Sequence, residues 1–203
     1  MGWGKMRGVQ SFLSVALTLG LITCGAPGAM LDGDAAAEIS GTVSFSQPLW
    51  DADVEYAVYA PGNYPGTHAD KAASHIYAYQ VFNASASSVM LSSLSVGVDP
   101  GSGAASATDD TFYGAAAGVA PLLSRLVGSP ATSAQWTIAP APGAHTTVLL
   151  FSSPNHYTFA PATVVDGGQG DTHDLPTPVP EPATLSLLAV AGALLGFRRR
   201  RRR

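Results

Sequence analysis

Turn-forming residues divide the middle of the chain into short segments, and their spacing restricts the possible folds more than any other feature of the sequence. Clusters rich in proline, glycine and asparagine stand at residues 61–63, 99–101, 140–143 and 153–155. Proline interrupts helices, while glycine and asparagine adopt the backbone conformations that tight turns require. The sequence therefore favours short strands over long helices.

The segments between these turns have the composition and alternation of β-strands. Val54, Tyr56 and Val58, for example, would share one face of a strand. We expect strands at residues 39–45, 54–60, 76–83, 89–98, 134–138, 146–152 and 157–165. Residues 113–118 fit a strand or a loop, and residues 121–127 fit a short helix or a turn. Seven or eight short strands predict an all-β fold, an antiparallel β-sandwich over residues 39–165.

Charged residues are few and unevenly distributed. They make up 12% of the 203 residues, about half the usual share. Only Lys71 and Arg125 accompany thirteen acidic residues between positions 30 and 180. Such an acidic body repels phosphate backbones, so no nucleic-acid partner is expected. Cys24 is the only cysteine and precedes the body, which therefore can have no disulfide, thiol nucleophile or cysteine-ligated metal.

The N-terminus has the order of regions found in secretion signals. Lys5 and Arg7 precede an apolar stretch at 9–22, and small residues follow. We expect a signal peptide over residues 1–29, recognised by the secretion translocon and signal peptidase and cleaved after Gly28 or Ala29. Residues 30–38 would be a flexible lead-in.

Three alternatives remain open at this end. The apolar segment also fits a buried helix or an uncleaved anchor, and Ala35 to Ala37 offer a later cleavage position. The segment ending at Cys24 loosely resembles a lipoprotein box, although Thr23 fits it poorly. Whether Cys24 is lipidated stays open.

The C-terminus has three consecutive parts. The first is the motif Val179, Pro180, Glu181 and Pro182, in which the prolines hold the backbone extended. The second is an apolar stretch at 185–197, and the expected transmembrane helix at 184–197 would be about 21 Å long. That length is marginal for a hydrocarbon core of about 30 Å. The third is a basic cluster that favours the cytoplasmic side: Arg198, Arg199, Arg200, Arg201, Arg202 and Arg203.

This arrangement closely resembles the PEP-CTERM sorting signal of Gram-negative envelope proteins, over residues 179–203. The resemblance implies an exosortase-type membrane peptidase as partner, cutting near the motif. It also implies a transient inner-membrane anchor with the ectodomain outside, followed by transfer to the cell surface or extracellular matrix. An ordinary tail anchor is the alternative. Residues 166–178, rich in glycine, aspartate and proline, are expected to form a linker that holds the body off the membrane.

Candidate binding chemistry in the body is sparse. Residues 166–174 contain three aspartates and three glycines and resemble a calcium loop, although one residue short of the repeat pattern. The histidines lack zinc-binding spacing, so a zinc site would have to be assembled by the fold: His68, His75, His145, His156 and His173. No metal site and no cofactor are therefore predicted. Aromatic residues offer surfaces for stacking on sugars, or equally core material: Trp50, Trp136, Tyr56, Tyr59, Tyr64, Tyr77 and Tyr79.

Catalytic patterns are equally weak. Asp51, Asp53 and Glu55 would share one strand face, and Asp109 adjoins Asp110. Such groups could suggest a glycosidase, which needs two carboxylates that face one cleft. A solvated strand explains them as well, and no G-x-S-x-G motif is present. We therefore predict a non-catalytic exported envelope or extracellular-matrix protein. The alternatives are a surface module that binds carbohydrate, such as exopolysaccharide, or a cation, and, less favoured, a secreted hydrolase.

Overall fold

The computed structural model describes residues 31–111 and 118–180 of the chain. The expected signal peptide at 1–29 and the expected membrane helix at 184–197 lie outside these residues. Within the described part of the chain, no helix has the length and apolar character needed to cross a bilayer.

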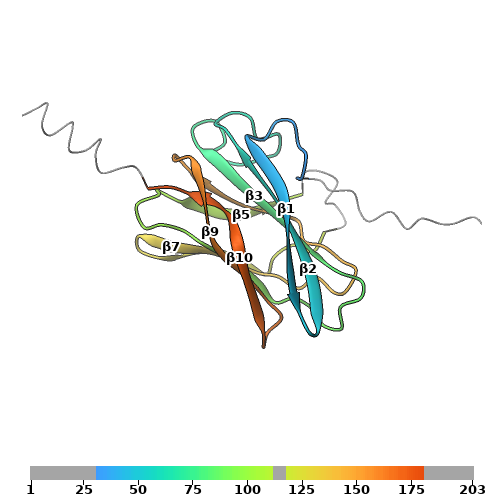
Figure 1. The fold of residues 1–203 in the computed structure, drawn as a ribbon. Coiled ribbons are helices and arrows are strands. Elements are labelled where there is room, and N and C mark those ends of the chain that lie inside the picture. Colours follow the sequence, from blue (N-terminus) through green and yellow to red (C-terminus); the bar gives the residue numbers. More distant parts are fainter. Residues whose placement is uncertain (1–30, 112–117, 181–203) are drawn as a thin grey trace, which may run out of the picture.

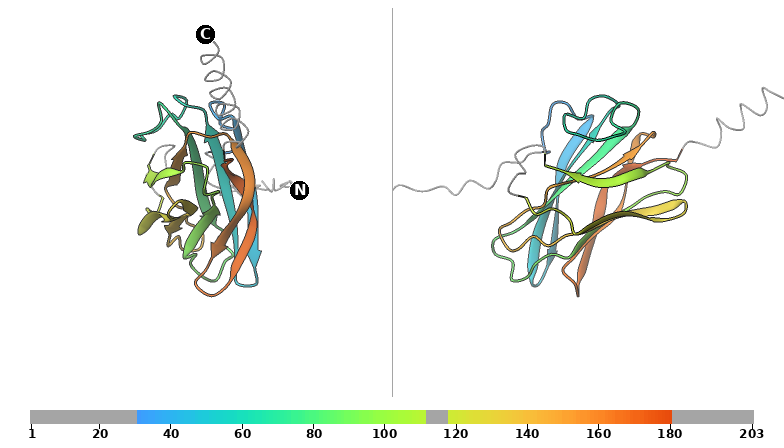
Figure 2. Two further views of the ribbon diagram at one scale, coloured as in Figure 1. Left: turned by 90° about the vertical axis from the view of Figure 1, so that its left-hand side faces the viewer. Right: turned by 180° about the vertical axis from the view of Figure 1, so that it is seen from behind.

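Two five-stranded antiparallel sheets pack face to face (Figures 1 and 2), which confirms the predicted β-sandwich. The order in the first sheet is β1 (Ile39–Gln47), β2 (Trp50–Tyr59), β3 (His75–Asn83), β8 (Val148–Ser153) and β5 (Ala105–Asp110). The order in the second is β10 (Gly170–Pro178), β9 (Tyr157–Val165), β4 (Ser93–Gly97), β7 (Ala131–Thr137) and β6 (Leu123–Gly128).

Aromatic side chains fill the core between the two sheets. Tyr77 stacks on Phe151 with ring centroids 4.9 Å apart, and the Tyr79 ring lies 6.0 Å from that of Trp136. Both tyrosines and both neighbours are fully buried. The Trp136 indole N–H donates to the Thr108 carbonyl at 3.0 Å, and therefore ties β7 to β5 in the opposite sheet.

The first sheet is also covered on its outer face. Leu31 and Tyr64 pack there against Ala57, Tyr59 and Ile76, and all five are buried. The Leu31 amide donates to Glu55 Oε2 at 3.0 Å, and the Tyr59 hydroxyl donates to Asp34 at 2.7 Å. The prediction of a flexible lead-in at 30–38 is therefore wrong for the described residues 31–38, because an apolar anchor and two hydrogen bonds hold them on the sheet.

Three strands were not predicted, namely β5, β6 and β10, and all three are edge strands. β5 contains only small and polar residues, a register shift and a serine with positive φ, Ser106 (56°). β6 pairs with β7 alone, and its side chains are exposed or half-buried. The expectation of a short helix or turn at 121–127 is wrong, because Leu123 to Val127 continue the ladder with Thr137 to Ser133.

The expected linker at 166–178 is mostly the tenth strand. β10 pairs with β9 over its whole length, from Gly170 opposite Val165 to Pro178 opposite Tyr157. Leu175 is fully buried in the core, which an extended linker would not provide. The prolines of β10 are compatible with a strand because β10 lies at the edge of its sheet, where unpaired positions need no amide donor. The linker prediction is therefore wrong.

Candidate functional site

The predicted sorting motif begins directly where β10 ends. Val179 and Pro180 are described, and Val179 is 36% exposed. The Val179 amide donates to the His156 carbonyl at 2.8 Å, one residue beyond the end of the β9–β10 ladder. Glu181, Pro182 and the arginines 198–203 lie outside the described residues.

A shallow cavity of about 350 Å³ adjoins this exit point. Its walls come from the start of the β4–β5 connection and from the last residues of β10, and Pro180 itself contributes to the lining. A Cβ on Gly101 would lie 3.2 Å from the Pro180 side chain, so the absence of a side chain there leaves room for the motif. The first two motif residues therefore leave the domain along a defined surface.

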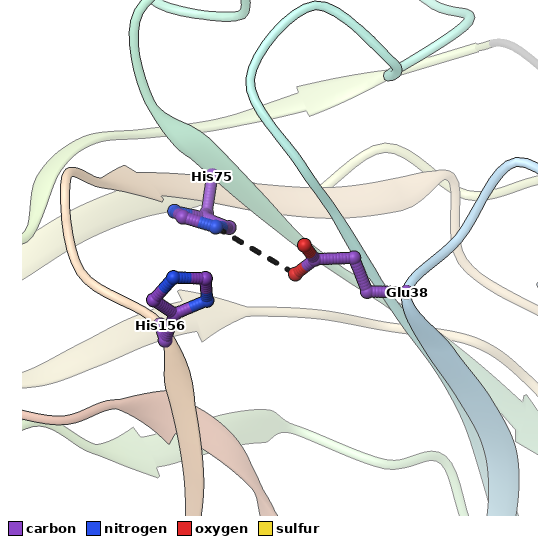
Figure 3. Close-up of side chains that lie close together, drawn as sticks. All are labelled: Glu38, His75 and His156. Atoms are coloured by element: carbon purple, nitrogen blue, oxygen red, sulfur yellow. Dashed lines mark ion pairs between the residues drawn. The ribbon is translucent and has the colours of Figure 1, made fainter.

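Three residues from separate parts of the chain meet at the same end of the sandwich (Figure 3). Glu38 precedes β1, His75 begins β3, and His156 precedes β9. Their nearest ligand atoms all lie within 4.8 Å of one another, and His75 Nε2 is 3.6 Å from Glu38 Oε2. The two imidazole rings are 4.6 Å apart between centroids.

The cluster combines one buried and two exposed side chains. His75 is 5% exposed, whereas Glu38 and His156 face solvent. Burial, opposed by the nearby Glu38 carboxylate, lowers the pKa of His75, so the neutral imidazole is favoured there. The buried Nδ1 of His75 has no hydrogen bond to the described residues. Sequence spacing could not reveal this group, because the fold alone assembles it.

The aspartate-rich segment at 166–174 forms a hairpin turn and the start of a strand. Asp166 Oδ1 accepts the amides of Gly168 and Gln169 at 2.8 and 2.7 Å, and the Gln169 amide contributes most to lowering the pKa of Asp166. This carboxylate therefore closes the β9–β10 turn.

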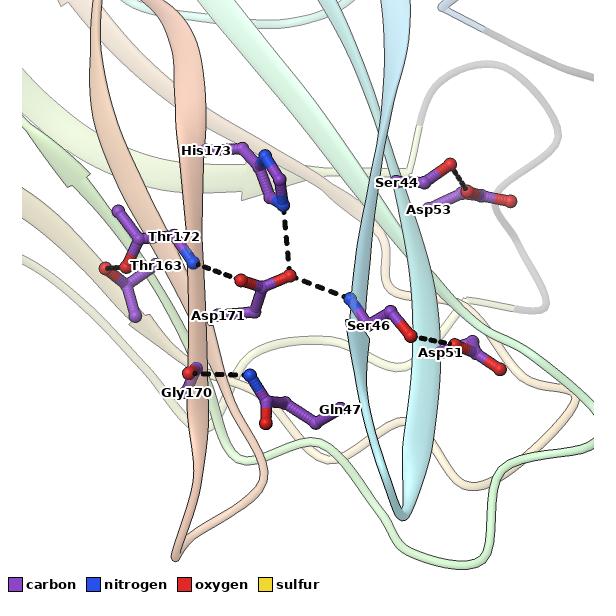
Figure 4. Close-up of polar contacts among 10 residues, drawn as sticks. All are labelled: Ser44, Ser46, Gln47, Asp51, Asp53, Thr163, Gly170, Asp171, Thr172 and His173. Atoms are coloured by element: carbon purple, nitrogen blue, oxygen red, sulfur yellow. Dashed lines mark hydrogen bonds and ion pairs between the residues drawn. The ribbon is translucent and has the colours of Figure 1, made fainter.

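Asp171 connects the two sheets at their neighbouring edges (Figure 4). Its Oδ2 accepts the Ser46 amide of β1 at 2.8 Å and lies 3.0 Å from His173 Nε2. The Gln47 side-chain amide donates to the Gly170 carbonyl at 3.1 Å, and the Phe45 ring meets His173 edge-on at 5.0 Å. The Asp171 carboxylate thus has a structural role between β1 and β10.

The predicted carboxylate pairs have structural partners as well. Ser44 and Ser46 donate from β1 to Asp53 and Asp51, which stand opposite them on β2 (Figure 4). Glu55 turns out to be buried, in contrast to its two solvent-facing neighbours. Asp110 accepts from the Tyr64 hydroxyl and the Thr67 amide, and Asp109 accepts from Thr147.

One serine, one histidine and one aspartate do approach each other, but without the geometry of a nucleophile and its base. His68 Nε2 lies 3.2 Å from the carbonyl of Ser106, and its Nδ1 accepts the Asp70 amide. The Ser106 hydroxyl donates to Asp70 instead of to the imidazole. A cavity of about 310 Å³ adjoins these residues. Activation of a serine needs its hydroxyl on the histidine, which this arrangement does not provide.

Most of the predicted sugar-stacking aromatics belong to the core. Six of the seven are buried, namely Trp50, Trp136, Tyr59, Tyr64, Tyr77 and Tyr79. Tyr56 alone is half-buried, and its ring meets the 45% exposed Phe159 edge-on at 6.2 Å. His145, one of the histidines considered for zinc, stacks on Phe82 with ring centroids 5.3 Å apart. The aromatic supply is therefore used chiefly for packing.

Comparison with known proteins adds one finding, at the end of the chain. Residues 178–203 match the family model described as the PEP-CTERM protein-sorting motif. No curated protein and no solved structure matches the chain. The matched segment starts at the last residue of β10, the point where the described domain ends. The chain thus carries a PEP-CTERM protein-sorting motif at its C-terminus, which implies an exported protein that is sorted to the cell surface and processed by an exosortase.

Proposed function

We propose that this chain is a non-catalytic envelope or extracellular-matrix protein that its C-terminal segment holds temporarily in the inner membrane. Residues 184–197 would form the anchor, residues 198–203 would stay in the cytoplasm, and the exosortase would cut near Glu181. The sandwich would then remain at the surface or enter the matrix. The observation that carries this proposal is the continuity of a complete β-sandwich with the matched sorting motif at residue 178.

The non-catalytic part of the proposal is supported by how the acidic side chains are used. Asp171 bridges β1 and β10, while Asp51 and Asp53 each accept a serine hydroxyl from the neighbouring strand. Asp109 and Asp110, both on β5, accept hydrogen bonds from Thr147 and Thr67 outside that strand. Glycosidase chemistry needs two carboxylates directed into one cleft, whereas these groups serve separate structural contacts.

The sorting proposal is tested by intact-mass analysis of the protein recovered from its native host. The wild-type chain should lose its C-terminal mass in the parent strain and keep it in a strain that lacks the exosortase. Glu181→Ala should keep the tail in both strains. Asp174→Ala removes an exposed carboxylate on β10, upstream of the motif, and serves as the matched control that should still be processed.

Two results would contradict the proposal. The first is the same C-terminal mass with and without the exosortase. The second is the finding, by labelling of intact cells, that the C-terminal arginines of the unprocessed chain face outward, because a cluster of six arginines favours the cytoplasmic side.

A further inference from the structure

The cluster of Glu38, His75 and His156 has the donor set of a transition-metal site. Two imidazoles and one carboxylate are the protein ligands of one well-known class of zinc centre, in which water completes a tetrahedron. Hard cations such as Ca²⁺ prefer oxygen ligands instead. The chemistry of this group therefore favours Zn²⁺ and related ions over Ca²⁺ and Mg²⁺.

The spacing of the donor atoms points in the same direction. Ligands about 2.1 Å from a tetrahedral zinc ion are roughly 3.4 Å from each other. His75 Nε2 and Glu38 Oε2 are 3.6 Å apart, which is close to this value and longer than a normal hydrogen bond. All three donor atoms fall within 4.8 Å of one another, so small side-chain rotations suffice to bring them around one ion.

The backbone already fixes each of the three ligands. The Glu38 amide donates to the Val58 carbonyl at 2.7 Å, and the His156 carbonyl accepts the Val179 amide at 2.8 Å. His75 pairs with Ser153 in the β3–β8 ladder and is buried. The cost of ordering the site on binding is therefore limited to side-chain rotamers, which favours affinity.

The charge around the cluster also suits a cation. Glu38 adds a negative charge, and the surrounding body has thirteen acidic residues against two basic ones. Because His156 and Glu38 face solvent, an ion could enter without rearrangement of the core.

We propose that Glu38, His75 and His156 bind one Zn²⁺ ion, with solvent completing its coordination. The site would join three segments at the end of the sandwich, namely the start of β1, the start of β3 and the loop before β9. It would be independent of exosortase processing, so either proposal can fail without the other.

The test is titration of the untagged full-length chain, in detergent and freed of metal by a chelator, with ZnCl₂ in a calorimeter. One Zn²⁺ should bind per chain, and His156→Ala and Glu38→Gln should each weaken binding at least about tenfold, since each removes one of three ligands. Both side chains are exposed, so these variants should fold. His173→Ala, which removes an exposed histidine elsewhere, should bind zinc like the wild type.

Two further measurements make the result decisive. Zn²⁺ should raise the Tm of the wild type and of His173→Ala but not that of His156→Ala, because an ion that binds only the folded state stabilises it. Bound Co²⁺ should give visible absorption that His156→Ala abolishes. Absence of saturable zinc binding, equal binding by the cluster variants and the wild type, or binding of Ca²⁺ in preference to Zn²⁺ would each overturn the proposal.

Discussion

The amide of Val179 donates a 2.8 Å hydrogen bond to the carbonyl of His156, so the first residue of the sorting motif is attached to the loop that precedes β9. The imidazole of the same histidine faces His75 and Glu38 (Figure 3). One residue therefore lies both at the exit of the C-terminal segment and in the candidate zinc site.

The tenth strand should be essential for stability. Leu175→Ala is expected to lower the free energy of unfolding by about 3 kcal/mol, because Leu175 is fully buried and its loss leaves a cavity. Asp174→Ala, one position earlier and exposed, should change it by less than about 0.5 kcal/mol. Urea unfolding followed by tryptophan fluorescence measures both. Equal, small effects would mean that 170–178 behaves as a linker after all.

Acid should weaken the connection between β1 and β10. The Ser46 amide, followed by the Thr172 amide and His173, keeps the pKa of Asp171 below its ordinary value of 3.8. A carboxyl group whose pKa is lower in the folded state stabilises the fold at pH values above its ordinary pKa. This contribution is lost as the pH falls through the lowered pKa. Asp171→Asn should therefore lower stability at pH 7 by about 1 kcal/mol and reduce the loss of stability between pH 4 and pH 2. Thermal unfolding across this pH range is the measurement, and parallel curves for both proteins would contradict the assignment.

The mature N-terminus should lie before Leu31. Leu31 is buried, and its amide donates to the buried Glu55, so cleavage within Ala35 to Ala37 would remove part of the outer core. A chain beginning at Glu38 should unfold about 2–3 kcal/mol more easily than one beginning at Met30. N-terminal mass analysis of the native protein provides the second readout. A mature terminus after residue 31 would show that this packing is dispensable.

Asp70 should attach the loop between β2 and β3 to the first sheet. Its Oδ2 accepts the Ser106 hydroxyl at 2.7 Å and the Ser152 hydroxyl at 2.8 Å, and the Ser106 bond contributes most to lowering the pKa of Asp70. Asp70→Ala and Ser152→Ala are each expected to lower the free energy of unfolding by about 1 kcal/mol. The double variant should cost less than the sum, because both changes remove the same bond. Full additivity in chemical unfolding would show that the two groups are independent.

Much of the sandwich could be predicted from sequence because most of its strands are segments with strand-like apolar residues between clear turns. The segments at 39–45, 76–83 and 157–165 correspond closely to β1, β3 and β9. β5, β6 and β10, which form three of the four sheet edges, lack this signal. β10 carries aspartates where its side chains face solvent and prolines where they are buried, and an edge position tolerates both.

The sorting motif could be recognised from the sequence, whereas the candidate zinc site could not. The motif is contiguous, so three neighbouring parts of the sequence were enough to identify it. Glu38, His75 and His156 come together only through the β3–β8 pairing and the position of the loop before β9. No local spacing encodes such a contact, since it depends on the register of strands far apart in the chain.

The position of Leu175 also sets the order of events during export. The sandwich cannot close until residue 178 has emerged on the far side of the membrane, because β10 supplies the last piece of its core. In the proposed topology only residues 179–183 then separate the domain from the anchor, and they span at most about 18 Å. Folding would therefore finish just as the apolar segment reaches the export channel. A chain arrested even ten residues earlier would leave the edge of β9 open to pairing with other molecules.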